Sequence, residues 1–277
     1  MKKIAVITRI RNDEYFLKHW IRYYGEQVGE ENLYVYLDGA DQTLPADCGK
    51  AHIIPCERFH EQVVKAEKLR LQFLSDRAAE LFKVYDIVIG VDVDEFLVVD
   101  PALNVTLLAY LSSLKIKGSV SGLGIDVGQH MDKEQSLDEA KTFLSQRHYA
   151  VLSPRYTKPC VINQPLTWGS GFHRIKGHNF HIDEHLYLFH FGGFDMDMLR
   201  ERFQDKDRMN TGRERHIKKR THTIRYVTSI KAHEGDDVMP LIRKLQTYLR
   251  PIFAWNKPTL FGVKVVIRIP KRFRTCI

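Results

Sequence analysis

The sequence predicts an α/β protein with a mostly parallel, twisted sheet that is flanked by helices. Three observations support this class. A short β-branched run at 3–8 reads as a buried strand, a helical pattern and a second strand follow it, and the run at 87–91 is apolar on both faces. A strand that is covered on both faces is typical of the centre of a parallel sheet.

The elements of the first half follow in order. The stretch 14–29 places apolar residues at helical spacing after Asn12 or Asp13 as N-cap, and strand 33–37 ends in the turn Asp38-Gly39. A weaker strand at 52–55 and a long helix over 57–82 lead to the strand within 85–100. Strand, helix and strand in this order form βαβ units.

The second half is less regular. We expect a helix from Pro101 to Leu114, a strand over 118–128, a surface helix within 132–149 and strand-like segments over 152–191. Helices follow over 197–203 and 239–250, and VKVVIRI near the end reads as a terminal strand.

Composition and charge narrow the class of protein. The 277 residues are 44% hydrophobic and 27% charged, as in an ordinary globular protein, and no repeat is visible. The net charge of +8 favours an anionic partner, which is nucleic acid, anionic lipid or a phosphorylated small molecule. No signal sequence or membrane-spanning segment appears, and the scattered cysteines form no CxxC pair, so we expect a cytoplasmic protein.

Three acidic residues follow the apolar strand within YDIVIGVDVDEFLVVD, namely Asp92, Asp94 and Glu95. Open α/β sheets bind ligands at the carboxyl ends of their strands, where this cluster falls. Two carboxylates on one face of a strand repel unless a cation offsets them, and hard oxygen donors favour Mg²⁺ or Mn²⁺, which in turn binds a diphosphate. The alternative is that the three residues cap a turn and pair with nearby lysines.

The segments VITRIRNDEYFLKHWIRYY, YLDGADQ and IVIGVDVDEFLVV together resemble the GT-A glycosyltransferases, specifically the family 2 and family 92-like bacterial group. The resemblance covers about the first half of the chain and departs from the Lys-Asn-Glu pattern of the group at 10–13. It implies a GT-A domain over 1–205, with a nucleotide-sugar-binding half (1–100), an acceptor-side half (101–205) and a basic C-terminal appendage (206–277). The implied activity is transfer of a sugar from a nucleotide diphosphate donor, with uridine as the expected nucleoside, to a glycan or glycolipid in bacterial surface polysaccharide synthesis, with inversion.

The resemblance also implies site residues. Thr8, Arg9 and Arg11 would hold the nucleoside and its phosphates, and Asp38 would accept hydrogen bonds from the base or ribose. Lys68, on the long helix, would reach the nucleotide, although a solvated helix face is the alternative. Asp92 would contact ribose or metal, and Asp94 would be the main ligand of Mn²⁺ or Mg²⁺.

The histidine-rich second half supplies the remaining candidates. His190, before two glycines, is the expected third metal ligand, with a hydrogen-bonded structural histidine as the alternative. His173 would contact the acceptor and Trp168 would stack on it, unless Trp168 packs in the core. An inverting transfer needs a general base, for which Asp126, Asp183 and Glu184 are the candidates.

Four other interpretations remain open. A phosphatase of the haloacid dehalogenase type would use Asp92 as nucleophile, but its motif ends the first strand and does not continue Glu-Phe. A basic nucleic-acid-binding protein would explain the charge, although no recognition motif appears and no nucleic acid is expected. A histidine zinc site lacks familiar spacing. Peripheral contact with anionic lipid at the inner face of the membrane is also open, through Phe273 and the arginines near it.

Overall fold

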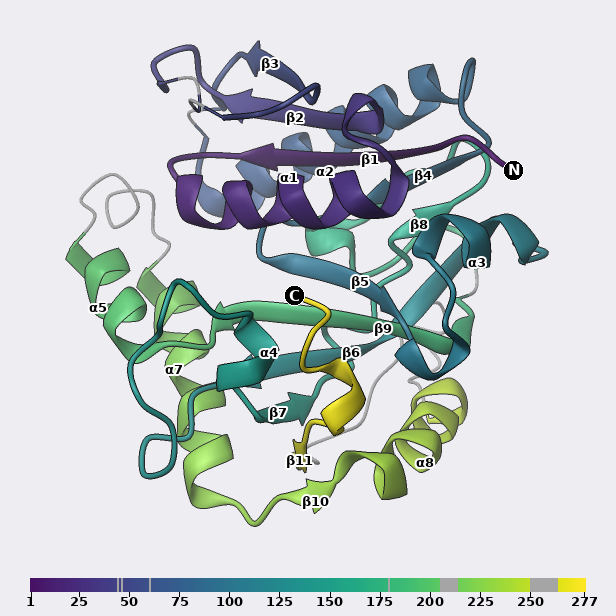
Figure 1. The fold of residues 1–277 in the computed structure, drawn as a ribbon. Coiled ribbons are helices and arrows are strands. Elements are labelled where there is room, and N and C mark those ends of the chain that lie inside the picture. Colours follow the sequence, from purple (N-terminus) through teal and green to yellow (C-terminus); the bar gives the residue numbers. More distant parts are fainter. Residues whose placement is uncertain (44, 46, 60, 179, 205–213, 250–263) are drawn as a thin grey trace.

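The computed structural model describes residues 1–277 except 44, 46, 60, 179, 205–213 and 250–263. Within the described residues, eleven strands form one sheet in the order β10-β11-β7-β6-β8-β4-β1-β2-β3, with β9 pairing to β6 and β5 pairing to β9. Helices flank this sheet (Figure 1), so the α/β class predicted from the sequence is confirmed.

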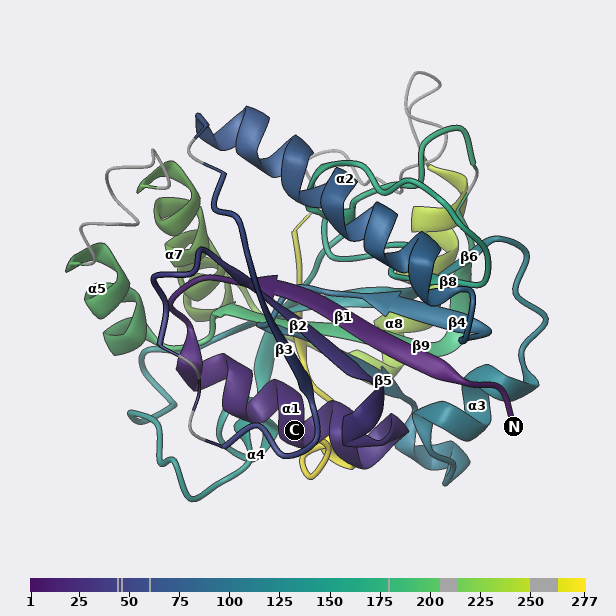
Figure 2. The ribbon, with the colours of Figure 1, turned by 90° about the horizontal axis from the view of Figure 1, so that it is seen from above.

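The first half is a parallel sheet between two helices. Its strands are β1 (Ile4–Ile10), β2 (Leu33–Asp38), β3 (His52–Cys56) and β4 (Ile87–Gly90), and β1 pairs in parallel with both β2 and β4. Helices α1 (Glu14–Val28) and α2 (Val63–Leu81) cover opposite faces of this layer (Figure 2). β1 and β4 are buried along their whole length, as their apolar sequences predict.

The second half extends the sheet with mixed pairing. Its strands are β5 (Glu95–Val99), β6 (Ser119–Gly128), β7 (Tyr149–Leu152), β8 (Val161–Ile162), β9 (Ile182–Gly193), β10 (His233–Glu234) and β11 (Val265–Arg268). The long β9 lies parallel to β6 and antiparallel to β5. This pairing brings His190 opposite both Glu95 and Asp126.

The remaining helices follow the first half of the sheet along the chain. They are α3 (Leu107–Ser113), α4 (Phe143–Gln146), α5 (Met196–Gln204), α7 (Glu214–Ser229) and α8 (Gly235–Tyr248), with 3-10 turns η1 (Glu30–Asn32), η2 (Pro101–Leu103), η3 (Ser170–Phe172) and η5 (Lys271–Phe273). None of the described helices has the length and apolar composition needed to cross a bilayer.

Several predicted boundaries differ from the structure. The helix expected over 101–114 is divided, because Asn104 takes a left-handed conformation with φ of 51°. The surface helix expected within 132–149 is only α4. Helix α7 was not predicted, since its basic sequence gives only a weak apolar stripe that includes Ile224 and Val227.

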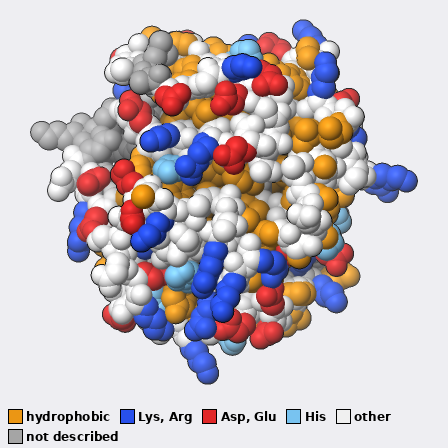
Figure 3. Space-filling view, in the orientation of Figure 1, with side chains coloured by type: hydrophobic (Ala, Val, Ile, Leu, Met, Phe, Trp, Pro, Cys, Tyr) orange, Lys and Arg blue, Asp and Glu red, His pale blue; other side chains and the backbone are white. Residues whose placement is uncertain are grey.

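The C-terminal segment is part of the core. β11 pairs with β7, and Phe273 is fully buried against Tyr187 and Phe189. Arg272 pairs with Asp100 and Asp236. Basic side chains over this segment and α8 are mixed with acidic ones (Figure 3). Phe273 is therefore not exposed for the contact with anionic lipid considered from the sequence, because its ring packs in the core.

Candidate functional site

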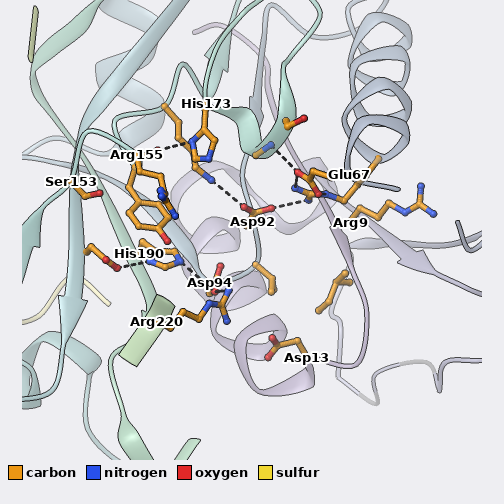
Figure 4. Close-up of a pocket in the computed structure, with 18 of the residues that line it drawn as sticks. Arg9, Asp13, Glu67, Asp92, Asp94, Ser153, Arg155, His173, His190 and Arg220 are labelled. Carbon is orange, nitrogen blue, oxygen red and sulfur yellow. Dashed lines mark hydrogen bonds and ion pairs between the residues drawn. The ribbon is translucent and has the colours of Figure 1, made fainter. Parts of the chain in front are cut away.

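A cavity of about 810 Å³ opens at the carboxyl ends of β1, β2 and β4. Its walls come from the loops that follow these strands, from the loop after β7, from β9 and from α7. Figure 4 shows part of its lining, and the labelled residues come from both halves of the chain. The cavity therefore lies where the position of the acidic cluster after a central strand predicts a ligand site.

Asp92 lies in the turn after β4, and basic residues neutralise it. Arg70 of α2 donates from Nη1 to Asp92 Oδ1 at 2.8 Å, and Lys158 donates from Nζ to Oδ2 at 3.1 Å. Burial opposes ionisation, but Lys158 and Arg70 hold the pKa of Asp92 well below its usual range. Glu67 accepts two hydrogen bonds from the same Arg70 guanidinium, which fixes its direction.

Glu95 is fully buried beneath this pair. Its carboxylate lies 2.5 Å from Lys158 Nζ, so one lysine serves both Asp92 and Glu95. Burial raises the pKa of Glu95 to about 7, since the attraction of Lys158 is offset by the repulsion of Asp92. Glu95 is therefore partly protonated near neutral pH.

Asp94 points to the other side of the cavity, toward His190 and Arg220 (Figure 4). Its Oδ2 lies 3.0 Å from Arg220 Nη2 and 3.7 Å from His190 Nε2. Burial opposes ionisation here too, yet Arg220 and His190 lower the pKa of Asp94. The two aspartates, which the sequence placed on one face, thus have separate partners.

The ring of His190 is fixed by two direct contacts, and one of these partners is itself held by a third residue. Nδ1 lies 2.7 Å from Asp126 Oδ1, the ring of Tyr156 stacks on it at 3.7 Å, and Thr223 donates to the second oxygen of Asp126 at 2.6 Å. Because an ionised carboxylate can only accept, Nδ1 donates to Asp126, and Nε2 faces Asp94. This is the orientation in which a carboxylate holds a metal-binding histidine.

Part of this arrangement fits a divalent cation. Asp94 Oδ2 and His190 Nε2 are close enough to share one ion, since metal–ligand distances are about 2.1 Å each. Arg220 already donates to this Asp94 oxygen, so an ion there would take the place of that hydrogen bond. Asp92 does not present an open oxygen, because Arg70 and Lys158 bind both. The described part of the chain holds no metal-type cluster of three His, Cys, Asp or Glu residues, so phosphate oxygens or water would complete the coordination.

The opposite end of the cavity contains Arg9, Arg11 and Asp38. Arg9 donates to Asp38 Oδ1 at 2.6 Å and lies over the ring of Phe59 at 4.0 Å, with Nε and Nη1 making no hydrogen bond to the described residues. Arg11 binds both oxygens of Asp41. The guanidinium of Arg9, the carboxylate of Asp38 and the ring of Phe59 are groups that can contact a ribose and a base.

Other predicted residues lie outside the cavity. Lys68 is exposed on α2, Thr8 is fully buried, and Trp168 is buried with Nε1 donating to Pro159 O at 2.9 Å. Trp168 packs on Phe172 in the core, so its predicted contact with an acceptor was wrong for this conformation. His173, by contrast, does line the cavity, with Nδ1 at 2.7 Å from Arg155 O.

The three residues predicted as candidate general bases lie in different places. Asp183 and Glu184 lie at the start of β9, about 20–23 Å from His190 at the usual rise of a strand. Asp183 accepts from Tyr110 there, and neither residue lines the cavity, so their position contradicts a role as base in it. Asp126 does line it, but both its oxygens are bound by His190 and Thr223.

Sequence reasoning missed four residues that shape the site: Arg70, Tyr156, Lys158 and Arg220. Arg70 lies only two residues from the predicted Lys68, and buried carboxylates require cations, so a search for basic residues on α2 would have found it. Lys158 and Arg220 carry no local signal, because neither lies in a pattern that the sequence associates with the acidic cluster.

Comparisons with known proteins do not identify a family. No protein-family model matches the chain, and no curated protein matches it. One solved structure, of CMP:2-keto-3-deoxy-manno-octonic acid synthetase complexed with CTP, is similar with 13% identity and a TM-score of 0.30, over 80% of this chain and 87% of that chain. That likeness is too distant to bear on function.

Proposed function

We propose that this chain is a GT-A-type glycosyltransferase that moves a sugar from a nucleotide diphosphate donor, with uridine as the expected nucleoside, to a glycan or glycolipid. The observation that carries the proposal is the meeting of Asp94 and His190 at 3.7 Å, with Asp126 behind the histidine, in a cavity at the carboxyl ends of parallel strands. A donor of this kind needs a cation site next to a nucleoside site, and the cavity has candidates for both.

Different residues along the cavity would bind different parts of the donor. Arg9 and Asp38 would bind the nucleoside, with the ring of Phe59 beside them. Arg220 would bind the diphosphate and stabilise it as the leaving group. Arg70 and Lys158 hold Asp92 in place from behind, which keeps the turn between β4 and β5 rigid.

Asp94 and His190 would hold Mn²⁺ or Mg²⁺. When bound, the ion neutralises diphosphate charge as the sugar leaves. Asp126 keeps the proton on Nδ1 of His190 and so leaves Nε2 available.

The phosphatase alternative is less well supported. A nucleophilic aspartate needs an oxygen open to the phosphoryl group, whereas both oxygens of Asp92 are bound by Arg70 and Lys158.

Calorimetry of UDP binding with and without Mn²⁺ tests the proposed function. We expect binding that strengthens with Mn²⁺ in the native protein and in Asp132→Asn, an exposed control outside the cavity. In Asp94→Asn, the factor by which Mn²⁺ strengthens UDP binding should fall by about tenfold or more, since the variant removes the charged ligand. Equal UDP affinity with Mn²⁺ and with chelator, in native protein and Asp94→Asn alike, would overturn the cation site.

A further inference from the structure

The charges that line the cavity are unevenly distributed. Except for Asp126, every carboxylate in the described lining comes from the first hundred residues: Asp13, Asp38, Glu61, Glu67, Asp92 and Asp94. The second half contributes the cations Arg155, Lys158, Arg220 and Lys264, together with three histidines, His173, His190 and His222. The wall that faces away from the nucleoside end is therefore basic.

Two of these cations have partners within the site and two do not. Lys158 binds Asp92 and Glu95, and Arg220 binds Asp94. Arg155 and Lys264 are exposed and form no ion pair with any described residue. Asp126, the single carboxylate that the second half contributes to the described lining, is already bound by His190 and Thr223.

The two unpaired cations stand beside fixed elements. Arg155 lies in the loop after β7, where its backbone carbonyl binds His173 at 2.7 Å, and Lys264 Nζ lies 5.7 Å from the ring centroid of Tyr226 on α7. Exposed cations on the wall of a cavity attract anions, and these two have no counterion among the described residues.

We propose that this wall binds an acceptor that carries an oxyanion, either a phosphate or a carboxylate, near the hydroxyl that receives the sugar. The inference rests on the proposed function, because the word acceptor presumes sugar transfer. The donor diphosphate has its own partners in Arg220 and the cation site, so Arg155 and Lys264 are left for a second anion. Arginine binds either oxyanion through paired N–H groups, and lysine binds it as a point charge.

The test uses protein saturated with UDP and Mn²⁺, so that the diphosphate site is filled. Glucose 6-phosphate, glucuronate and neutral glucose are titrated by calorimetry. We expect at least one charged probe to bind about tenfold more tightly than glucose, and the double variant Arg155→Gln/Lys264→Gln to lose that preference. A preference for glucose 6-phosphate assigns a phosphate, and one for glucuronate assigns a carboxylate.

Controls separate the two proposals. Lys244→Gln/Lys271→Gln removes the same charge from exposed positions outside the cavity and should keep the native preference. Normal UDP binding without any preference for charged probes, or a preference that survives in Arg155→Gln/Lys264→Gln, overturns the anionic acceptor and leaves the proposed function standing. Absence of UDP binding in the native protein overturns both.

Discussion

His190 Nδ1 lies 2.7 Å from Asp126 Oδ1, and these two residues, far apart in sequence, are direct neighbours across the parallel pairing of β6 and β9. The pairing fixes the imidazole so that its other nitrogen faces Asp94. Asp126 is therefore a positioning residue for His190, and the sequence-based idea that it takes the acceptor's proton does not suit its two occupied oxygens.

Asp126→Ala should weaken Mn²⁺ binding by about 10- to 100-fold, because the histidine loses the carboxylate that sets its tautomer and direction. Titration of Mn²⁺ by electron paramagnetic resonance in the presence of UDP measures this directly. Thr223→Val, which removes only the hydrogen bond behind Asp126, should have a smaller effect. Equal Mn²⁺ affinity in the native protein and Asp126→Ala would show that His190 is held by packing alone.

Gly192→Ala should disturb the same histidine. A Cβ at this position would meet His190 Cε1 at 2.5 Å and Arg220 Nε at 2.9 Å, so one or both side chains must move. We expect a loss of about 1–3 kcal/mol in the free energy of unfolding, together with weaker Mn²⁺ binding. Gly25→Ala on α1 would place a Cβ 2.8 Å from Glu30 Cγ, so that side chain must also move, but the position lies outside the cavity and Mn²⁺ binding should stay native. Chemical denaturation of both variants decides the matter.

Glu95→Gln should change how stability depends on pH. The folded-state pKa of Glu95 is about 7, above the value of 4.5 expected when unfolded, so the folded protein holds a proton there that the unfolded chain releases. The contribution of this group to stability is complete below pH 4.5 and falls as pH rises to about 7, by an amount on the order of a few kcal/mol. Denaturation at pH 5 and pH 8 should show a smaller decrease in Glu95→Gln than in the native protein, while the exposed Glu80→Gln should behave like the native protein. Parallel decreases in all three would refute the raised pKa.

Lys158→Met should be strongly destabilising, because it leaves Asp92 and Glu95 buried without their shared cation. Removing one partner from a buried ion pair costs about 3–5 kcal/mol. The double variant Lys158→Met/Glu95→Gln should recover part of that loss. Thermal unfolding of both proteins is the measurement, and a double variant no more stable than Lys158→Met would contradict the shared-charge arrangement.

Phe273→Ala tests the placement of the C-terminal segment. The ring is fully buried against Tyr187 and Phe189, so its loss should lower the free energy of unfolding by about 3–5 kcal/mol. Binding to vesicles that contain anionic lipid should not change. Native stability together with lost vesicle binding would instead favour the membrane contact considered from the sequence.

The elements that could be predicted from the sequence are those whose buried residues recur at a regular local spacing. The apolar residues of β1, β2, β4 and α1 recur at strand or helix spacing, which predicts that these elements are buried. The position of the acidic cluster is predictable because it directly follows β4. Helix α7 shows the limit, since it packs through a few residues such as Thr223, Ile224 and Val227 within a basic sequence.

The sequence by itself determined the α/β class, the central buried strand and the position of Asp92 and Asp94 at its carboxyl end. Only the tertiary structure decided which charges meet there: Arg70 and Lys158 on Asp92, and Arg220 and His190 beside Asp94. Periodicity records whether a residue is buried, whereas the partner of a buried charge is set by strand pairing and helix packing between distant segments.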